Sequence, residues 1–163
     1  GVKANMFNKL IENLLSGSSR AFQNQQAEID AMSKSQAIIR FEPNGTILEA
    51  NENFCNAVGY SLEEIQGKHH SLFVEEAEKN SQEYKDFWES LANGEFQARQ
   101  FKRVRKDGSE IWLEASYNPL FNKKGEVYRV VKYATDITAS KLRNADRTGQ
   151  LNAISKSQAV IEF

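Results

Sequence analysis

The sequence predicts an α+β domain: a five-stranded antiparallel sheet with short helices on one face, preceded by a long N-terminal helix. Two observations support this fold class. Two short apolar segments flank an Asn-Gly pair within residues 38–50, and three further strand-like segments follow at 97–105, 110–119 and 126–136. Between these two groups lie three short segments whose apolar residues have helical spacing. A sheet covered on one face by helices too short to pack closely is expected to leave an internal cavity.

Residues 5–32 have the pattern of an amphipathic helix, interrupted at Gly17–Ser19. The apolar residues that recur three and four positions apart are Phe7, Leu10, Ile11 and Leu14, and the stripe continues with Phe22, Ile29 and Met32. The pattern supports equally a helix packed on its own domain and a helix that dimerises or carries a signal. We interpret residues 1–5 as a cloning remnant that precedes a native start at Met6.

The first hairpin is predicted to turn at Asn44-Gly45, a pair that tolerates the positive φ of a type I′ turn. Asn51 then caps a short helix, which Gly59 ends. Cys55 in this helix is predicted to be a small buried apolar residue.

Two more helices follow. Ser61 and Glu64 form a capping box that opens another short helix, and Gly67 closes it. Ser81 begins a longer helix over 82–93. Its apolar stripe consists of Tyr84, Phe87, Trp88 and Leu91, and Gly94 ends it.

The last three strands are joined by turns at 106–109 and 122–125. In the final strand we expect Val127, Val131 and Tyr133 to alternate with Arg129 and Thr135.

An internal repeat defines the domain organisation. The segment AMSKSQAIIRF at 31–41 returns as AISKSQAVIEF at 153–163, an offset of 122 residues, which is about one domain. We therefore expect a leader helix at 1–35, one domain at 36–139, and at 140–163 a linker helix with the first strand of a second copy.

Composition narrows the function classes. Apolar residues make up 40% of the chain, charged residues 26%, and the net charge is −1, which predicts neither nucleic acid nor a membrane surface as partner. No apolar run approaches the roughly 20 residues of a membrane span. Cys55 is the only cysteine, which fits the cytoplasm. No phosphate loop or catalytic triad is visible, so we expect no enzyme.

Five motifs together resemble the PAS sensory domain, over roughly residues 36–139. They are Ala50-Asn51-Glu52-Asn53-Phe54, the segment from Gly59 to Gly67, Arg105-Lys106-Asp107-Gly108-Ser109, Tyr117-Asn118-Pro119-Leu120 and Asp136-Ile137-Thr138. More narrowly, segments 67–70, 87–91 and 112–119 resemble the tandem PAS domains of soluble bacterial chemoreceptors, including those of energy taxis and biofilm dispersal.

This resemblance implies a sensory input domain of a bacterial chemotaxis signal transducer. Such a domain binds a small ligand or redox cofactor and signals through its flanking helices. The implied partners are a second copy in a homodimer joined by the leader helix, a second PAS domain and a downstream signalling domain. The alternative is a PAS input or dimerisation module of a sensor histidine kinase or a diguanylate cyclase, without a bound cofactor.

The candidate cofactor-binding residues are Asn51, Phe54, His69, His70, Trp88, Trp112, Tyr117 and Asn118. Flavin-binding energy-taxis PAS domains use an asparagine and a tryptophan at the positions of Asn51 and Trp88, so the resemblance makes FAD a candidate. Residues 74–79 depart from the segment that anchors flavin phosphates in those receptors. The alternative is that both tryptophans only pack. Asn118 either faces a ligand or ends its strand.

His69 and His70 form the only histidine pair. Adjacent side chains in an extended segment point to opposite sides, so at most one is expected to enter the interior. Haem is the less favoured cofactor, because haem-binding PAS domains place their ligand on the later helix, which here lacks histidine.

Asp136 and Thr138 are the candidate signal-coupling residues. Asp136 can hydrogen-bond back to the junction between the last strand and the following helix, so that a change of strand twist reaches that helix. Equally, Asp136 can be a simple helix-start residue.

Overall fold

The computed structural model describes the backbone of residues 2–161 and the side chains of residues 4–155, and it divides into two compact units. The first unit, residues 1–35, contains the single helix α1 (Val2–Ser35), which confirms the predicted leader helix. α1 runs unbroken through 17–19, where an interruption was predicted, because one helical glycine costs only about 1 kcal/mol. Within residues 2–161, no helix has both the length and the apolar character needed to cross a bilayer.

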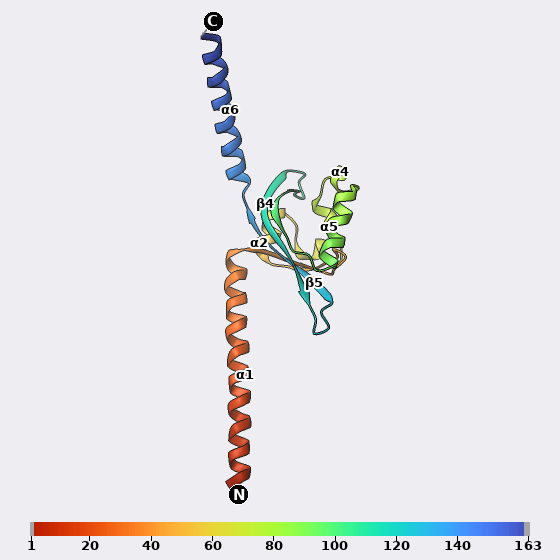
Figure 1. Ribbon diagram of the computed structural model, residues 1–163, viewed down its shortest axis with the longest axis vertical. Coiled ribbons are helices and arrows are strands. Elements are labelled where there is room, and N and C mark those ends of the chain that lie inside the picture. The colour runs from red at the N-terminus through yellow and green to blue at the C-terminus, as the bar shows by residue number, and fades with distance from the viewer. Residues whose placement is uncertain (1, 162–163) are drawn as a thin grey trace. The chain divides into compact units, whose positions relative to one another are not determined.

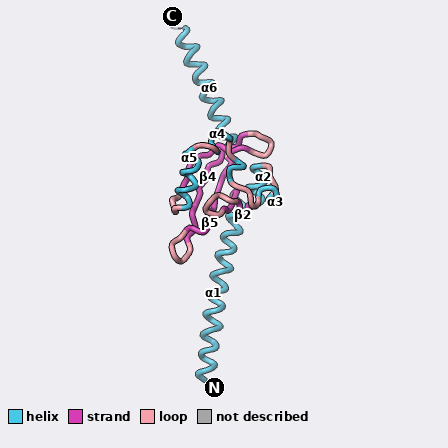
Figure 2. Tube along the Cα trace, turned by 90° about the vertical axis from the view of Figure 1, so that its right-hand side faces the viewer, coloured by secondary structure: helices cyan, strands magenta, loops and turns pink. Residues whose placement is uncertain are grey.

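The second unit begins at Gln36 and is built on an antiparallel sheet, as predicted. Its strands are β1 (Ala37–Phe41), β2 (Ile47–Ala50), β3 (Gln97–Val104), β4 (Glu110–Phe121) and β5 (Val127–Asp136). They lie in the order β2-β1-β5-β4-β3 (Figures 1 and 2), so the first and last strands of the domain are neighbours.

Short helices cover one face of this sheet (Figure 1). They are α2 (Glu52–Val58), α3 (Leu62–Ile65), the 3-10 helix η1 (His70–Phe73), α4 (Glu76–Lys79) and α5 (Gln82–Ala92). In the view of Figure 2, α5 lies toward the left of the domain and α2 with α3 toward the right. The single-turn helices η1 and α4 were not predicted, since one turn is too short to show a helical period.

The predicted caps are present. The Asn51 side chain accepts a hydrogen bond from the Phe54 amide at 3.0 Å, and Ser61 and Glu64 form the capping box. Ser81 accepts a hydrogen bond from the amide of Tyr84 at 3.1 Å.

The first turn differs from the predicted type I′ turn. Within the described chain, positive φ occurs at glycines alone, so Asn44 has negative φ and only Gly45 (φ 92°) is left-handed. A Cβ at Gly45 would lie 2.5 Å from His69 Nε2 and 2.9 Å from the ring of Trp88. Glycine is therefore required here for two reasons, the backbone angle and the close approach of these side chains.

The inward face of β5 was predicted incorrectly. Val130, Lys132 and Ala134 face the helices, whereas Tyr133 lies on the opposite face. The reason is the register: Lys132 pairs with Tyr117 of β4 and with Ile39 of β1, both of which point inward. Apolar residues occupy both faces of β5, so local alternation does not reveal the phase.

The C-terminal helix α6 (Thr138–Ile161) continues where the sequence predicts the first strand of a second domain. A strand needs a neighbouring strand for its backbone hydrogen bonds, whereas a helix satisfies them locally. Residues 162 and 163 of the repeat lie outside the described residues. The second domain stays a prediction.

We expect Asn51→Ala to lower the free energy of unfolding by about 1–2 kcal/mol. The Asn51 oxygen accepts hydrogen bonds from the amides of Phe54 and Ile38, and its amide group donates to the Gln36 carbonyl at 2.7 Å. Denaturant unfolding measures the loss. Asn56→Ala, at an exposed position of the same helix, is the control and should change stability by less than about 0.5 kcal/mol. Equal losses in the two variants would contradict this role.

Candidate ligand site in the domain interior

Aromatic rings fill the space between the sheet and the short helices. The buried rings are those of Phe41, Phe54, Phe73, Tyr84, Phe87, Trp88, Phe101 and Tyr117. Tyr117 of β4 is at the centre of this cluster: its ring lies 4.9 Å from Phe87 and 5.1 Å from Phe101, measured between centroids. Most contacts are edge-to-face, which is the favoured arrangement of such rings.

His70 is enclosed completely within this aromatic cluster, with no exposed surface. η1 holds it between two phenols: its Nδ1 lies 2.8 Å from Tyr84 Oη and its Nε2 lies 3.0 Å from Tyr117 Oη. Burial lowers the pKa of His70 well below its ordinary value, and the nearby cations Arg103 and Lys132 and the His69 ring add to this effect. The imidazole is therefore neutral, with one donor and one acceptor nitrogen.

The two tyrosines differ in acidity, which indicates the direction of these hydrogen bonds. Burial raises the pKa of Tyr84 above its ordinary value. Burial acts the same way on Tyr117, but the Lys132 and Arg103 cations bring the pKa of Tyr117 below its ordinary value. Tyr117, the stronger acid, is the better donor. We therefore assign its O–H as donor to His70 Nε2, and His70 Nδ1–H as donor to Tyr84 Oη.

Lys132 is a second buried polar residue, with 1% of its surface exposed. Its Nζ lies 4.8 Å from the centroid of the Tyr117 ring and 5.7 Å from that of Phe54. No carboxylate of the described residues forms an ion pair with it. Burial lowers the pKa of Lys132, so its charge opposes folding at neutral pH.

Arg103 is the third buried polar residue of the interior, with 2% of its surface exposed. Its Nη1 donates to the Lys102 carbonyl at 2.8 Å and reaches Glu78 Oε1 at 3.3 Å, and its guanidinium carbon lies 4.8 Å from the centroid of the Phe101 ring. Arg103 Nε and Trp88 Nε1 are buried without any hydrogen-bond partner among the described residues. The unsatisfied buried groups at this site are therefore all donors.

The structure brings together four of the eight residues predicted to hold a cofactor, namely Phe54, His70, Trp88 and Tyr117. Asn51 does not reach the interior, because its side chain is engaged by the backbone at the start of α2. Asn118 lies on the opposite face of the sheet, where its Nδ2 donates to the Val131 carbonyl at 3.1 Å.

Trp112 and His69 also lie outside the cluster. Trp112 projects from the face opposite Ile111 and Leu113, with Lys141 Nζ 4.5 Å from its ring centroid. The His70 ring is fully enclosed and the His69 ring is half-buried, but both lie near Trp88, with centroids 5.3 and 5.8 Å from that ring. His69 Nε2 lies 2.8 Å from the Asn44 carbonyl oxygen, and its Nδ1 accepts a hydrogen bond from the Ser71 amide. Cys55 is half-buried rather than fully buried, and burial raises its pKa.

Tyr84, Arg103 and Lys132 were not among the predicted site residues. The sequence contains a signal for Arg103: the turn at 105–109 pairs it with Ile111, which is in the inward phase of β4. Lys132 has no such local signal, because only pairing with Tyr117 and Ile39 places it inward.

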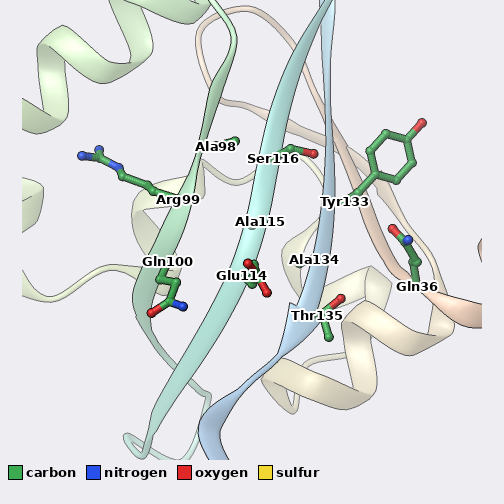
Figure 3. Close-up of a pocket in the computed structure, with 10 residues that line it drawn as sticks. All are labelled: Gln36, Ala98, Arg99, Gln100, Glu114, Ala115, Ser116, Tyr133, Ala134 and Thr135. Carbon is green, nitrogen blue, oxygen red and sulfur yellow. The ribbon is translucent and has the colours of Figure 1, made fainter. Parts of the chain in front are cut away.

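Among the described residues, a hollow lined by His69, Tyr84 and Trp88 lies beside α5, and two others adjoin the sheet. The first of these two, of about 250 Å³, reaches Arg103 and Tyr84 from the surface, between α5 and the edge strand β3. The second, of about 360 Å³, lies on the opposite side of the sheet and contains none of the predicted site residues. Figure 3 shows it spread across β3, β4 and β5, with Arg99 pointing away from the other labelled residues.

The candidate coupling residues form one compact junction. Asp136 Oδ1 accepts hydrogen bonds from the Thr138 amide at 2.9 Å and the Thr138 hydroxyl at 2.6 Å. Thr138 Oγ1 in turn accepts from the Trp112 amide at 3.0 Å, and the Ile137 amide donates to the Trp112 carbonyl. The first turn of α6 is thus tied to the start of β4, the strand that carries Tyr117 further along.

Comparisons with known proteins agree with this architecture. The sequence model of the family described as PAS fold matches residues 47–134. The chain is 41% identical over 133 residues to the biofilm dispersion protein of Pseudomonas aeruginosa, covering 82% of this chain and 32% of that protein. It is 28% identical over 96 residues to the aerotaxis receptor of Escherichia coli, covering 59% of this chain and 19% of the receptor. The chain therefore spans a third or less of these relatives.

Solved structures share the fold. An RNA-binding light-oxygen-voltage receptor superposes with a TM-score of 0.64 at 21% identity, over 85% of this chain and 39% of that one. A light-oxygen-voltage domain studied with a flavin analogue superposes with a TM-score of 0.60 at 17% identity, over 77% of this chain and 96% of that one. At these identities the likeness establishes the fold alone.

The buried His70 gives a pH-dependent stability that can be measured. Its pKa in the folded protein is lower than the value of about 6.5 in the unfolded chain, so below about pH 6.5 the unfolded state binds a proton that the folded state does not. The wild type should lose up to about 1.4 kcal/mol per pH unit between about pH 6.5 and 5.5. Urea unfolding at several pH values measures this slope, which His70→Gln should remove.

His69→Gln is the matched control, since His69 lies outside the enclosed cluster. It should keep the slope that His70 causes. A slope unchanged in His70→Gln would show that His70 is protonated equally in both states.

Proposed function

This chain belongs to the PAS fold family, and from that premise we propose that it is the sensory input domain of a bacterial chemotaxis signal transducer. The observation that carries the proposal is the 41% identity with the biofilm dispersion protein over most of the chain. The similarity to the aerotaxis receptor supports it, because that relative is also a sensory receptor. We place the domain in the cytoplasm as part of this proposal.

The proposed input is a small ligand at the aromatic and cationic interior. Within this interior, Tyr117 lies on the same strand as Trp112, whose backbone is bonded to the start of α6. A ligand that shifts Tyr117 therefore acts on β4, and β4 acts on α6. Asp136 and Thr138 are the proposed coupling residues of this path.

FAD is the cofactor that the family suggests, and a flavin analogue features in one of the fold neighbours. Of the two residues that the resemblance assigns to a flavin, Trp88 lies in the interior, whereas the side chain of Asn51 is engaged by the backbone. The rings of Phe87 and Trp88 pack around Tyr117, 4.9 and 6.3 Å from its centroid. The residues in this arrangement do not form a flavin site, and we propose a smaller ligand.

Haem fits no better. Both nitrogens of His70 are engaged by tyrosines, and both nitrogens of His69 are engaged by backbone groups. An imidazole must offer a free nitrogen to bind haem iron.

We expect protein purified without added cofactor to show no visible absorption from flavin or haem. Mass spectrometry of molecules released on denaturation should find a small colourless compound. A stoichiometric flavin or haem spectrum would contradict the choice of a small ligand, while leaving the sensory role in place.

A second copy of the chain is the proposed partner through α1. The apolar side chains that this helix exposes include Phe7, Leu10, Leu14, Phe22 and Ile29. Such a stripe on an isolated helix favours pairing with another helix. A second PAS domain and a downstream signalling domain are further proposed partners.

The alternative output is a sensor histidine kinase or a diguanylate cyclase. A two-component system protein of Emericella nidulans is 30% identical over 109 residues, which favours this alternative. The output domain of the full-length gene distinguishes the two.

The coupling role can be tested with Asp136→Ala in the full-length receptor. Removing the carboxylate releases Thr138 from β5 and should weaken the response of swimming cells to a gradient by about fivefold or more. Ligand retention should stay unchanged. A wild-type response would contradict coupling through this junction.

The matched control is Asp107→Ala. Asp107 Oδ1 accepts from the Ser109 amide at 2.9 Å and the Ser109 hydroxyl at 2.6 Å, the same arrangement as at Asp136 but in the turn between β3 and β4. It should respond like the wild type, because that turn does not lead into α6.

A further inference from the structure

We propose that the interior of the domain binds a small organic carboxylate, whose oxygens are the acceptors that Arg103 Nε and Trp88 Nε1 lack and whose charge is the counter-charge that Lys132 lacks. This proposal rests on the sensory function proposed above and names the chemical class of its ligand.

The donors come from three different elements and meet around one side chain. Lys132 of β5 has its Nζ 4.8 Å from the centroid of Tyr117, and the ring of Trp88 on α5 lies 6.3 Å from the same centroid. Arg103 of β3 lies over Phe101, whose ring is 5.1 Å from Tyr117. These buried donors therefore line one region rather than being scattered through the core.

The charge of this region is unbalanced. Lys132 and Arg103 are almost completely buried, and Glu78 is the only carboxylate of the described residues that contacts either of them. His70 is neutral and contributes no negative charge. A buried cation without a counter-charge is strongly unfavourable, so the region is suited to an anion and not to a cation or a neutral molecule.

A carboxylate fits these donors better than an inorganic anion does. The planar guanidinium of Arg103 can bind both oxygens of a carboxylate. The surrounding walls, formed by Phe87, Phe101 and Tyr117, are aromatic and suit an organic body more than a hydrated ion. The ligand enters from the adjoining hollow of about 250 Å³, which Arg103 lines and behind which Lys132 and Trp88 lie, and this hollow sets a small size for it.

Glu78 occupies the mouth of this region. It belongs to α4, its side chain is 41% exposed, and its Oε1 lies 3.3 Å from Arg103 Nη1, which is long for a charged pair. Glu78, Arg103, Tyr84 and Phe87 all line the same hollow. Glu78 thus acts as an internal carboxylate that the ligand replaces at Arg103. Replacing it would release α4 from β3 next to α5, the helix that carries Trp88.

The test uses the purified chain, with acetate, benzoate and succinate as probes. Binding is measured by calorimetry and by tryptophan fluorescence, since Trp88 lines the region. At least one carboxylate should bind with 1:1 stoichiometry, and both Lys132→Met and Arg103→Gln should weaken it by about tenfold or more. Glu78→Gln should tighten binding by about fivefold, because it removes the internal competitor.

Two matched control variants remove one carboxylate and one lysine charge at surface positions outside the proposed site. Glu76→Gln lies on the same helix as Glu78 but pairs with Lys79 at the surface, and Lys123→Met lies in the exposed turn before β5. Both should bind like the wild type. Lys132→Met should unfold at no lower temperature than the wild type, since it removes an uncompensated buried cation, so a loss of binding cannot be attributed to unfolding.

Three results would overturn the proposal. They are the failure of every carboxylate probe to bind, binding that Lys132→Met leaves unchanged, and binding of benzamide or inorganic phosphate as tight as that of benzoate. If the Asp136→Ala receptor still loses its response while the carboxylates fail, only the ligand class is wrong. If the carboxylates bind but Asp136→Ala responds normally, the coupling path is wrong and the binding site stands.

Discussion

The position of β5 between β1 and β4 is the constraint on which the rest of this structure depends. This pairing makes the first and last strands of the domain neighbours at the centre of the open sheet. Its register places Lys132 in one row with Ile39 and Tyr117. Because side chains alternate across a strand, a shift of one residue would exchange Lys132 for Val131 or Tyr133 on the inward face. The register therefore determines whether the interior carries a positive charge.

The consequences of this register extend to the helices. The Lys132 cation in the interior helps to lower the pKa of Tyr117, and Tyr117 in turn hydrogen-bonds His70 of η1. His70 connects to Tyr84 on α5. A chain of polar contacts thus runs from β4 through His70 to α5, and aromatic rings surround it. A polar network of this kind fixes a single arrangement of its members more strictly than apolar packing does.

The same interior has a stability cost that apolar packing would avoid. Two buried donor groups of the described residues, Arg103 Nε and Trp88 Nε1, lack acceptors, and the buried Lys132 has no carboxylate partner. Proteins commonly keep such unfavourable groups where function requires them. In the same domain, the junction between β5 and α6 is held by two short hydrogen bonds from Thr138 to Asp136. Buried donors are therefore unpaired at the proposed ligand site, whereas the hydrogen bonds are satisfied at the junction that leads into α6.

Local patterns in the sequence determined the order of strands and helices along the chain and the caps at Asn51, Ser61 and Ser81, because each depends on residues a few positions apart. The family motifs also indicated the junction at Asp136. Only the tertiary structure decided which side chains share the interior. The side chain of Asn51 hydrogen-bonds the backbone, and Trp112 and Asn118 lie on the face of the sheet away from the helices. Arg103 and Lys132 are buried in the core. Those outcomes depend on strand register and on contacts between residues far apart in the chain, and the periodicity of a single strand contains no information about them.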